Sequence, residues 1–349
     1  MRVIPIAVLL GVVLLSGCIG QGAQKNGAAG PSVLATLAIG VYPAFAAYDP
    51  GNGYVYIPDS NNSTVSVINL TSVVATVTVG SNPFSAAYDS GDGLVYVSDS
   101  NSSTVTVINA TSVIATIPVG DSPSFAAYDP ASGYLYVPNY DDGTVSVISG
   151  TSVIATDMVG NGPSYATYDP ADGYVYVVDI GDGSVSVISG SAVIATIPVG
   201  SSPLLAAYDS GDGCVYVPNY DDGTVSVING TSVIATVQVG NDPLSTAYDS
   251  GNGYVYVTNS GDGTVSVING TSLVGTLSVG SNPSFAAYDP GNGYVYVENS
   301  DDGTVSVING TSLISTLSVG NSPSFATYDP GDGYVYVENG DDGTVSVLD

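Results

Sequence analysis

Acidic side chains are the most abundant groups in this sequence that could do chemistry. The chain has 31 Asp and Glu residues against two cations, Arg2 and Lys25, and it has no histidine. Imidazole bases, histidine-ligated metals and Ser-His-Asp or Cys-His arrangements are therefore excluded. Lysine and arginine are absent after position 25, which excludes Schiff bases and cationic oxyanion clamps there. Paired carboxylates, with or without calcium, are the catalytic groups that remain.

Aspartate recurs in two regular sets. One set follows a tyrosine: Asp49, Asp89, Asp129, Asp169, Asp209, Asp249, Asp289 and Asp329. The other set occupies short turns: Asp141, Asp142, Asp182, Asp221, Asp222, Asp262, Asp301, Asp302, Asp341 and Asp342. Because an Asp in a turn accepts backbone N–H bonds from residues just ahead of it, a structural role is the first interpretation of both sets. Calcium binding through the same oxygens is the alternative.

The two glutamates break this regularity. Glu298 and Glu338 occupy one position in two adjacent copies of a repeat, and an Asn and an Asp-Asp turn follow each of them. We predict a cation-binding or glycan-binding patch on one face, formed by Glu298, Asp301, Asp302, Glu338, Asp341 and Asp342. The alternative is a recent duplication that left a solvated acidic surface, and the near identity of the two copies favours it.

A 40-residue unit that recurs eight times from Pro31 to Asp349 carries all these residues. In the copy 281–320, apolar β-branched and aromatic residues predict strands at 284–288, 294–299, 304–309 and 312–319. Gly, Pro, Asp and Asn separate these strands. A repeat of this length with four strands is typical of a β-propeller blade, so we predict an all-β, eight-bladed propeller of four-stranded antiparallel blades.

The ends of the array predict how the ring closes. The chain enters with a fourth-strand sequence, 32–39, and leaves after a third strand, 344–348. Pairing of these two segments would complete the eighth blade and cover an edge that otherwise invites aggregation.

The N-terminal segment resembles a lipoprotein-type signal peptide. Residues 1–17 carry Arg2 and then an apolar stretch. The sequence Leu15-Ser16-Gly17-Cys18 resembles a lipoprotein cleavage motif that ends at Cys18, as in archaeal surface lipoproteins. The resemblance implies lipidation of Cys18, a flexible linker over 18–30 and an extracytoplasmic, membrane-anchored location. The propeller predicted from the repeat then spans 31–349. The alternative is an ordinary signal peptide. The other cysteine, Cys214, stands where most copies have tyrosine, which predicts a small buried side chain.

Eight Asn-x-Ser/Thr sequons are candidate N-glycosylation sites: Asn61, Asn62, Asn69, Asn101, Asn109, Asn229, Asn269 and Asn309. Five of them follow from one repeated turn, so unused turn residues are the alternative.

The charge balance bears on partners and on environment. A net charge of −29 makes nucleic acid and anionic lipid surfaces unfavourable partners. Only 9% of the residues are charged, which argues against ordinary halophilic adaptation. We favour an acidic environment, since a propeller without cations would carry almost no charge once its carboxylates are protonated.

The string YVYVTNSGDGTVSVING at 254–270 contains the YVTN signature, and the array resembles the YVTN β-propeller repeat family. The resemblance implies a secreted or cell-surface location, notably in archaeal surface layers, and it implies fold more than chemistry. Family members commonly have seven blades, so eight copies are a departure. The chain has no Trp, unlike the eight-bladed quinone-dependent dehydrogenases and the tryptophan-aspartate repeats.

We therefore expect a non-enzymatic, membrane-anchored cell-surface propeller for adhesion, envelope structure or recognition of a surface protein or glycan, without a cofactor. The alternative is a calcium-dependent hydrolase or lactonase with carboxylates at the channel mouth. A carboxylate cluster that breaks the eightfold symmetry would favour the enzyme, and a symmetric lining would favour the module. A purely architectural envelope subunit is a third class.

Overall fold

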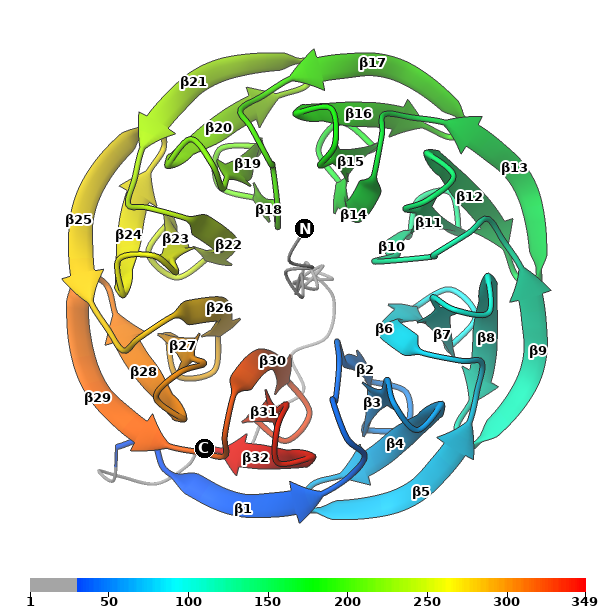
Figure 1. The fold of residues 1–349 in the computed structure, drawn as a ribbon, viewed down its shortest axis with the longest axis horizontal. Coiled ribbons are helices and arrows are strands. Elements are labelled where there is room, and N and C mark those ends of the chain that lie inside the picture. Colours follow the sequence, from blue (N-terminus) through cyan, green and yellow to red (C-terminus); the bar gives the residue numbers. More distant parts are fainter. Residues whose placement is uncertain (1–29) are drawn as a thin grey trace.

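The computed structural model describes residues 30–349, which form eight four-stranded antiparallel sheets. Figure 1 shows them as blades around a central axis, so the predicted eight-bladed propeller is confirmed. The predicted signal peptide, Cys18 and nearly all of the linker lie outside the described residues. Within residues 30–349, no helix is long and apolar enough to cross a membrane.

The strands of each blade follow one another from the axis outward in chain order, except that the outermost strand of blade eight is the N-terminal strand. The innermost strands are β2 (Ala47–Asp49), β6 (Pro83–Asp89), β10 (Ala127–Asp129), β14 (Pro163–Asp169), β18 (Ala207–Asp209), β22 (Pro243–Asp249), β26 (Pro283–Asp289) and β30 (Pro323–Asp329). The second strands are β3 (Tyr54–Asp59), β7 (Leu94–Asp99), β11 (Tyr134–Asn139), β15 (Tyr174–Asp179), β19 (Cys214–Asn219), β23 (Tyr254–Asn259), β27 (Tyr294–Asn299) and β31 (Tyr334–Asn339).

The outer half of each blade holds the third and fourth strands. The third strands are β4 (Thr64–Asn69), β8 (Thr104–Asn109), β12 (Thr144–Ser149), β16 (Ser184–Ser189), β20 (Thr224–Asn229), β24 (Thr264–Asn269), β28 (Thr304–Asn309) and β32 (Thr344–Leu348). The fourth strands are β5 (Ser72–Thr78), β9 (Ser112–Pro118), β13 (Ser152–Met158), β17 (Ala192–Pro198), β21 (Ser232–Gln238), β25 (Ser272–Ser278), β29 (Ser312–Ser318) and, for blade eight, β1 (Val33–Ala38).

The predicted closure of the ring is confirmed. β1 pairs antiparallel with β32, and Thr36 lies opposite Ser346. Backbone bonds from Ile39 N to Gly343 O and from Asp349 N to Ser32 O, 3.0 and 3.1 Å long, extend the pairing at both ends. The N-terminal strand therefore occupies the outer edge that β32 would otherwise expose.

The second strands are buried on both faces because each blade packs between two neighbours. In β27, Val295 and Val297 belong to a buried cluster with Tyr256 of blade six, whereas Tyr296 belongs to a cluster with Val337 of blade eight. Full burial of one such side chain contributes about 1.5–3 kcal/mol. The blade interfaces are thus the apolar core of the ring.

The connections lie on two opposite rims. The loop rim is the end of the ring that holds the turns between second and third strands and the loops that enter each blade. A turn and an entering loop contact each other there, since Ser300 N donates to Asn282 O at 3.1 Å. The turn rim is the opposite end, which holds the turns between first and second strands and between third and fourth strands. Ser32 N donates to Asp349 Oδ1 at 2.9 Å, so β1 begins at the turn rim.

Candidate functional sites

Aromatic and leucine side chains of the innermost strands and the loops before them fill the centre of the ring. The ring centroid of Phe45 lies 3.6 Å from that of Phe325 and 4.2 Å from that of Phe125, and Phe84 lies 4.5 Å from Phe125. Phe285, Leu204, Leu205 and Leu244 belong to the same buried cluster. An apolar plug therefore occupies the place where a propeller could open an axial ligand site.

A symmetric ring of tyrosine–aspartate pairs lies at the turn rim. Asp49 Oδ1 accepts a bond from Gly51 N at 2.8 Å, and its carboxylate also accepts the hydroxyl of Tyr88 from the next blade. Burial, and then the charge of Asp49, raise the pKa of Tyr88 to about 12. The remaining seven pairs are Asp89–Tyr128, Asp129–Tyr168, Asp169–Tyr208, Asp209–Tyr248, Asp249–Tyr288, Asp289–Tyr328 and Asp329–Tyr48. These aspartates hold neighbouring blades together, and their arrangement keeps the eightfold symmetry.

The aspartates of the loop rim hold the entering loops. Asp302 Oδ2 accepts from Ser281 N at 2.7 Å, and Asp301 Oδ1 accepts from Asn282 Nδ2 at 3.2 Å. In blade eight, Asp342 accepts from both the backbone and the side chain of Asn321, at 2.6 and 2.8 Å. Asp341 Oδ2 accepts from Ser322 Oγ at 2.6 Å. All four carboxylates are exposed, and each already has a structural partner.

The predicted position of Glu298 and Glu338 is corrected by the structure. Both side chains are fully buried, whereas Asp301, Asp302 and Asp341 are exposed. Glu298 lies in register with Phe285 and Val305, on the face of β27 that Tyr296 presents to blade eight.

Glu338 occupies the equivalent face of β31, toward blade one. The alternation of side chains along a strand thus turns both glutamates into blade interfaces. They do not share one face with the four aspartates.

Burial without partners makes the two glutamates unusual. Their four carboxyl oxygens have no hydrogen-bond partner, and residues 30–349 contain no Lys, Arg or His to balance a charge. Burial raises the pKa of Glu338 to about 8, opposed only by the electrostatic effect of its own backbone N–H. Burial, with a smaller contribution from Glu338, also raises the pKa of Glu298 well above its ordinary value. Burial therefore favours the neutral acid form of both groups, which are enclosed away from solvent.

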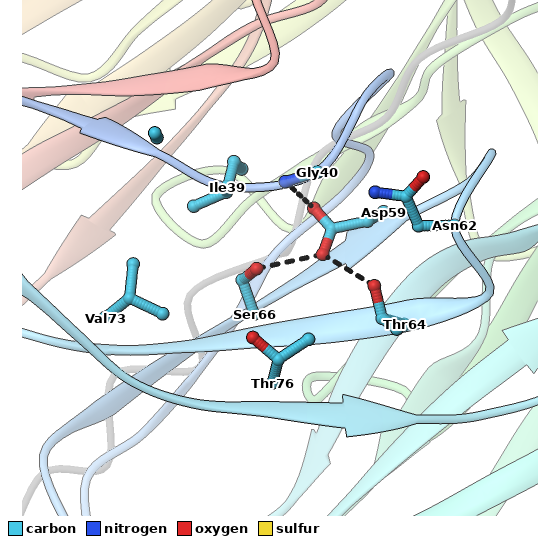
Figure 2. Close-up of a pocket in the computed structure, with 9 residues that line it drawn as sticks. Ile39, Gly40, Asp59, Asn62, Thr64, Ser66, Val73 and Thr76 are labelled. Carbon is cyan, nitrogen blue, oxygen red and sulfur yellow. Dashed lines mark hydrogen bonds between the residues drawn. The ribbon is translucent and has the colours of Figure 1, made fainter.

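A third ring of acids and amides escaped the sequence analysis. The last residue of each second strand is Asp or Asn and is buried: Asp59, Asp99, Asn139, Asp179, Asn219, Asn259, Asn299 and Asn339. Figure 2 shows Asp59 accepting bonds from Gly40 N, Ser66 Oγ and Thr64 Oγ1, at 3.0, 2.8 and 3.1 Å. Asp59 and these three partners border a hollow of about 110 Å³ between the outer parts of blades eight and one.

An asparagine makes the same three contacts with the oxygen and the nitrogen of its side-chain amide. Asn299 Oδ1 accepts from Gly280 N at 3.0 Å, while Nδ2 donates to Thr304 and Ser306 at 3.1 and 2.9 Å. The aspartates lack a donor, and burial raises the pKa of Asp99 and of Asp179 to about 6. The sequence contained a signal for this ring of buried polar residues. The position is Asp or Asn in every copy, and Ser or Thr follows it five and seven residues later.

Two further sequence predictions can be placed. Cys214 is buried, as predicted, and burial raises the pKa of its thiol. All eight sequon asparagines are exposed, so each is sterically open to a glycan; their occupancy stays a prediction. Within residues 30–349, no group of three or more His, Cys, Asp or Glu side chains is arranged to hold a metal ion.

The sequence matches no known family model and no curated protein. Solved structures match over most of its length. Sqt1 from Saccharomyces cerevisiae is 12% identical with a TM-score of 0.78, over 90% of this chain and 98% of Sqt1. The C-terminal WD40 domain of Sif2 is 12% identical with a TM-score of 0.71, over 91% of this chain and 97% of that domain. Virginiamycin B lyase from Staphylococcus aureus is 12% identical with a TM-score of 0.65, over 90% and 97%.

These similarities show a β-propeller fold and no more, because the identities are low. The set includes both a WD40 domain and an enzyme, so it does not choose between binding and catalysis. A variant of the lyase with a histidine replaced by alanine is described as catalytically inactive, and the present chain has no histidine.

Proposed function

We propose that this protein is a non-enzymatic, lipid-anchored cell-surface propeller of the YVTN type, which acts by contacting other surface macromolecules. The observation that carries the proposal is that both predicted sets of aspartates are used within the fold around a filled centre. The turn-rim aspartates hold neighbouring blades together, the loop-rim aspartates hold the entering loops, and the apolar plug closes the axis. The two repeated sets of aspartates thus have structural roles, and we infer that function depends on the outer surface.

The circumference of the ring supports a role in contacts with other molecules. At one equivalent position, the fourth strand of every blade has an aliphatic side chain that is 44–53% accessible: Leu34, Val74, Ile114, Ile154, Ile194, Ile234, Val274 and Ile314. These strands form the outer edge of each sheet, and Asp157 is the single charged residue among them. Uncharged edges with exposed aliphatic residues are suited to packing against neighbouring molecules, as adhesion or envelope structure requires.

Cross-linking on native membranes, followed by mass spectrometry, tests the proposal. Capture of one abundant surface protein or glycoconjugate would support recognition, and capture of further copies of the chain would support an envelope subunit. Failure to capture anything, together with calcium-dependent turnover in a hydrolase and lactonase screen, would overturn it. A Cys18→Ser variant tests the anchor separately, because loss of the lipid should release the protein from the membrane fraction.

A further inference from the structure

One sector of the loop rim departs from the eightfold pattern. The residue that follows each second strand is small in five blades: Ser60, Ser100, Ser260, Ser300 and Gly340. In blades three, four and five it is Tyr140, Ile180 and Tyr220, which we call the tyrosine arc. Because the three blades are adjacent, the arc is one continuous feature of the rim.

The backbone of the arc is the same as elsewhere, so only the side chains differ. Tyr140 N, Ile180 N and Tyr220 N donate to the carbonyl of the entering loop at 3.0, 3.1 and 3.0 Å, as Ser300 N does at 3.1 Å. The serine hydroxyls donate to nearby backbone carbonyls instead: Ser300 Oγ donates to Pro323 O of the next blade at 2.7 Å, and Ser260 Oγ donates to Asp242 O of its own blade at 3.0 Å.

The large side chains remain accessible. Tyr140 is 42% exposed, and Ile180 and Tyr220 are partly exposed while packing against the central apolar cluster.

The neighbouring loop is adapted to the arc. Tyr140 lies over Gly162, where a Cβ atom would come within 3.3 Å of Tyr140 Cε2. The other blades have a side chain at this place: Tyr42, Asn82, Ser122, Ser202, Asp242, Asn282 and Ser322. The single glycine thus occurs where the tyrosine needs room.

Seven aspartates of the entering loops and turns surround the arc. They are Asp121, Asp141, Asp142, Asp182, Asp221, Asp222 and Asp242, and all but the partly exposed Asp242 are exposed. Asp142, Asp182 and Asp222 each accept one loop N–H through Oδ2. Their Oδ1 atoms accept no hydrogen bond from residues 30–349, and no cation of the ring offsets their charge. The sector therefore combines aromatic surface with uncompensated negative charge.

We propose that the tyrosine arc binds a lysine- or arginine-rich segment of another surface protein. The inference rests on the proposed function and names the partner chemistry of one face. A cationic head stacks on tyrosine and pairs with a carboxylate, and its aliphatic stem packs on Ile180. The negative field of a ring without cations also speeds the approach of a basic segment. A neutral glycan would use the aromatic faces but would gain nothing from seven carboxylates.

The repeat supplies a matched control sector. Blades seven and eight carry exposed Asp301, Asp302, Asp341 and Asp342 on the same rim, but Ser300 and Gly340 replace the large side chains. Binding by charge alone would use both sectors, whereas binding by the arc uses one.

The test measures the affinity of the full-length protein for a fluorescent 12-residue peptide of alternating lysine and serine, at low and moderate salt. The double variant Tyr140→Ser/Tyr220→Ser, which introduces residues that other blades carry, should bind about tenfold more weakly. The double variant Asp301→Asn/Asp302→Asn should change affinity less than about twofold. Unfolding temperatures check that both variants are folded.

Equal loss in the two variants, or binding of a neutral oligosaccharide but not the peptide, would overturn the inference. The proposed function is tested apart from it. If the arc variant is still cross-linked to the wild-type partner on membranes, the inference fails and the function stands. If the peptide binds through the arc, but native membranes yield no partner and the protein shows calcium-dependent turnover, the arc's affinity for basic segments stands and the proposed function fails.

Discussion

Raising the pH should destabilise this propeller, which reverses the usual course of acid denaturation. Ten carboxyl groups among the described residues have a pKa that is shifted upward. The groups are Asp59, Asp89, Asp99, Asp157, Asp169, Asp179, Asp209, Glu298, Asp329 and Glu338. Burial is the largest cause in each case, and the ring has no cation to oppose it.

The sign follows from proton linkage. A carboxyl group with a raised pKa binds a proton more tightly in the folded protein than in the unfolded chain. Between the two pKa values the folded state therefore holds more protons, and the free energy of unfolding falls as the pH rises. The window opens near pH 4, the ordinary pKa of an aspartate, and extends to about 8, the pKa of Glu338.

Asp99 and Asp179 give a lower bound for the magnitude, because the pKa values of Glu338 and Asp329 are shifted further upward. The pKa values of Asp99 and Asp179, about 6 against an ordinary value near 3.9, correspond to about 3 kcal/mol each. Together they remove about 6 kcal/mol between pH 4 and pH 7, a large share of a typical total of roughly 5–15 kcal/mol. For a chain of this size we expect the unfolding temperature to fall by about 10 °C.

Thermal unfolding followed by circular dichroism at pH 2, 4, 6 and 8, at constant ionic strength, measures the effect. The protein should stay folded at pH 2, where its unfolding temperature should be highest, and the unfolding temperature should fall from pH 4 to pH 8. The control is Asp99→Asn/Asp179→Asn, which installs the amide that five other blades carry and should make the curve less steep between pH 4 and pH 7. A maximum at pH 8, or an equally steep curve in the double variant, would refute the reasoning.

Three further predictions concern the plug, the closure and the blade contacts. Phe45→Ala should lower the free energy of unfolding by about 3–5 kcal/mol in denaturant titrations, because it opens a cavity among packed rings. Deleting residues 32–39 should expose β32 as an edge and produce oligomers in light scattering; a monomer would contradict the closure. Tyr336→Phe removes the 3.0 Å bond to Leu70 O across the blade eight–blade one interface and should lower the free energy of unfolding by about 1 kcal/mol, with Tyr56→Phe, whose hydroxyl accepts from Asn52 Nδ2 of its own blade at 2.8 Å, as control.

The periodic features of the fold could be predicted because every copy repeats the same evidence. In the copy 281–320, the predicted second and third strands agree with β27 and β28 at both ends. The closing pair followed from counting strands, since a spare fourth strand at one end matches a missing one at the other. Periodicity thus determines topology without any knowledge of contacts.

The positions of residues that depart from the repeat were harder to predict. Glu298 was assigned to the surface because it is charged and precedes an acidic turn, yet the strand turns it into an interface. The equivalent residues in other blades, such as Pro218, Val178 and Thr258, are uncharged, which was the available signal for a buried position. The plug could not be predicted either, because Phe45 and Phe125 meet across blades that are far apart in sequence.

The absence of cations connects the composition to the buried acids. In an ordinary protein, a buried carboxylate is held in its charged form by Arg or Lys. Here the partners are Ser, Thr, Tyr and backbone N–H groups, as at Asp59, so burial favours the neutral acid. A protonated Asp both donates and accepts a hydrogen bond, as Asn does, which explains how Asp99 and Asn139 hold equivalent places in one ring. Such a ring should therefore be more stable in acid, where its carboxyl groups are protonated, than at higher pH, as the acidic-environment hypothesis requires.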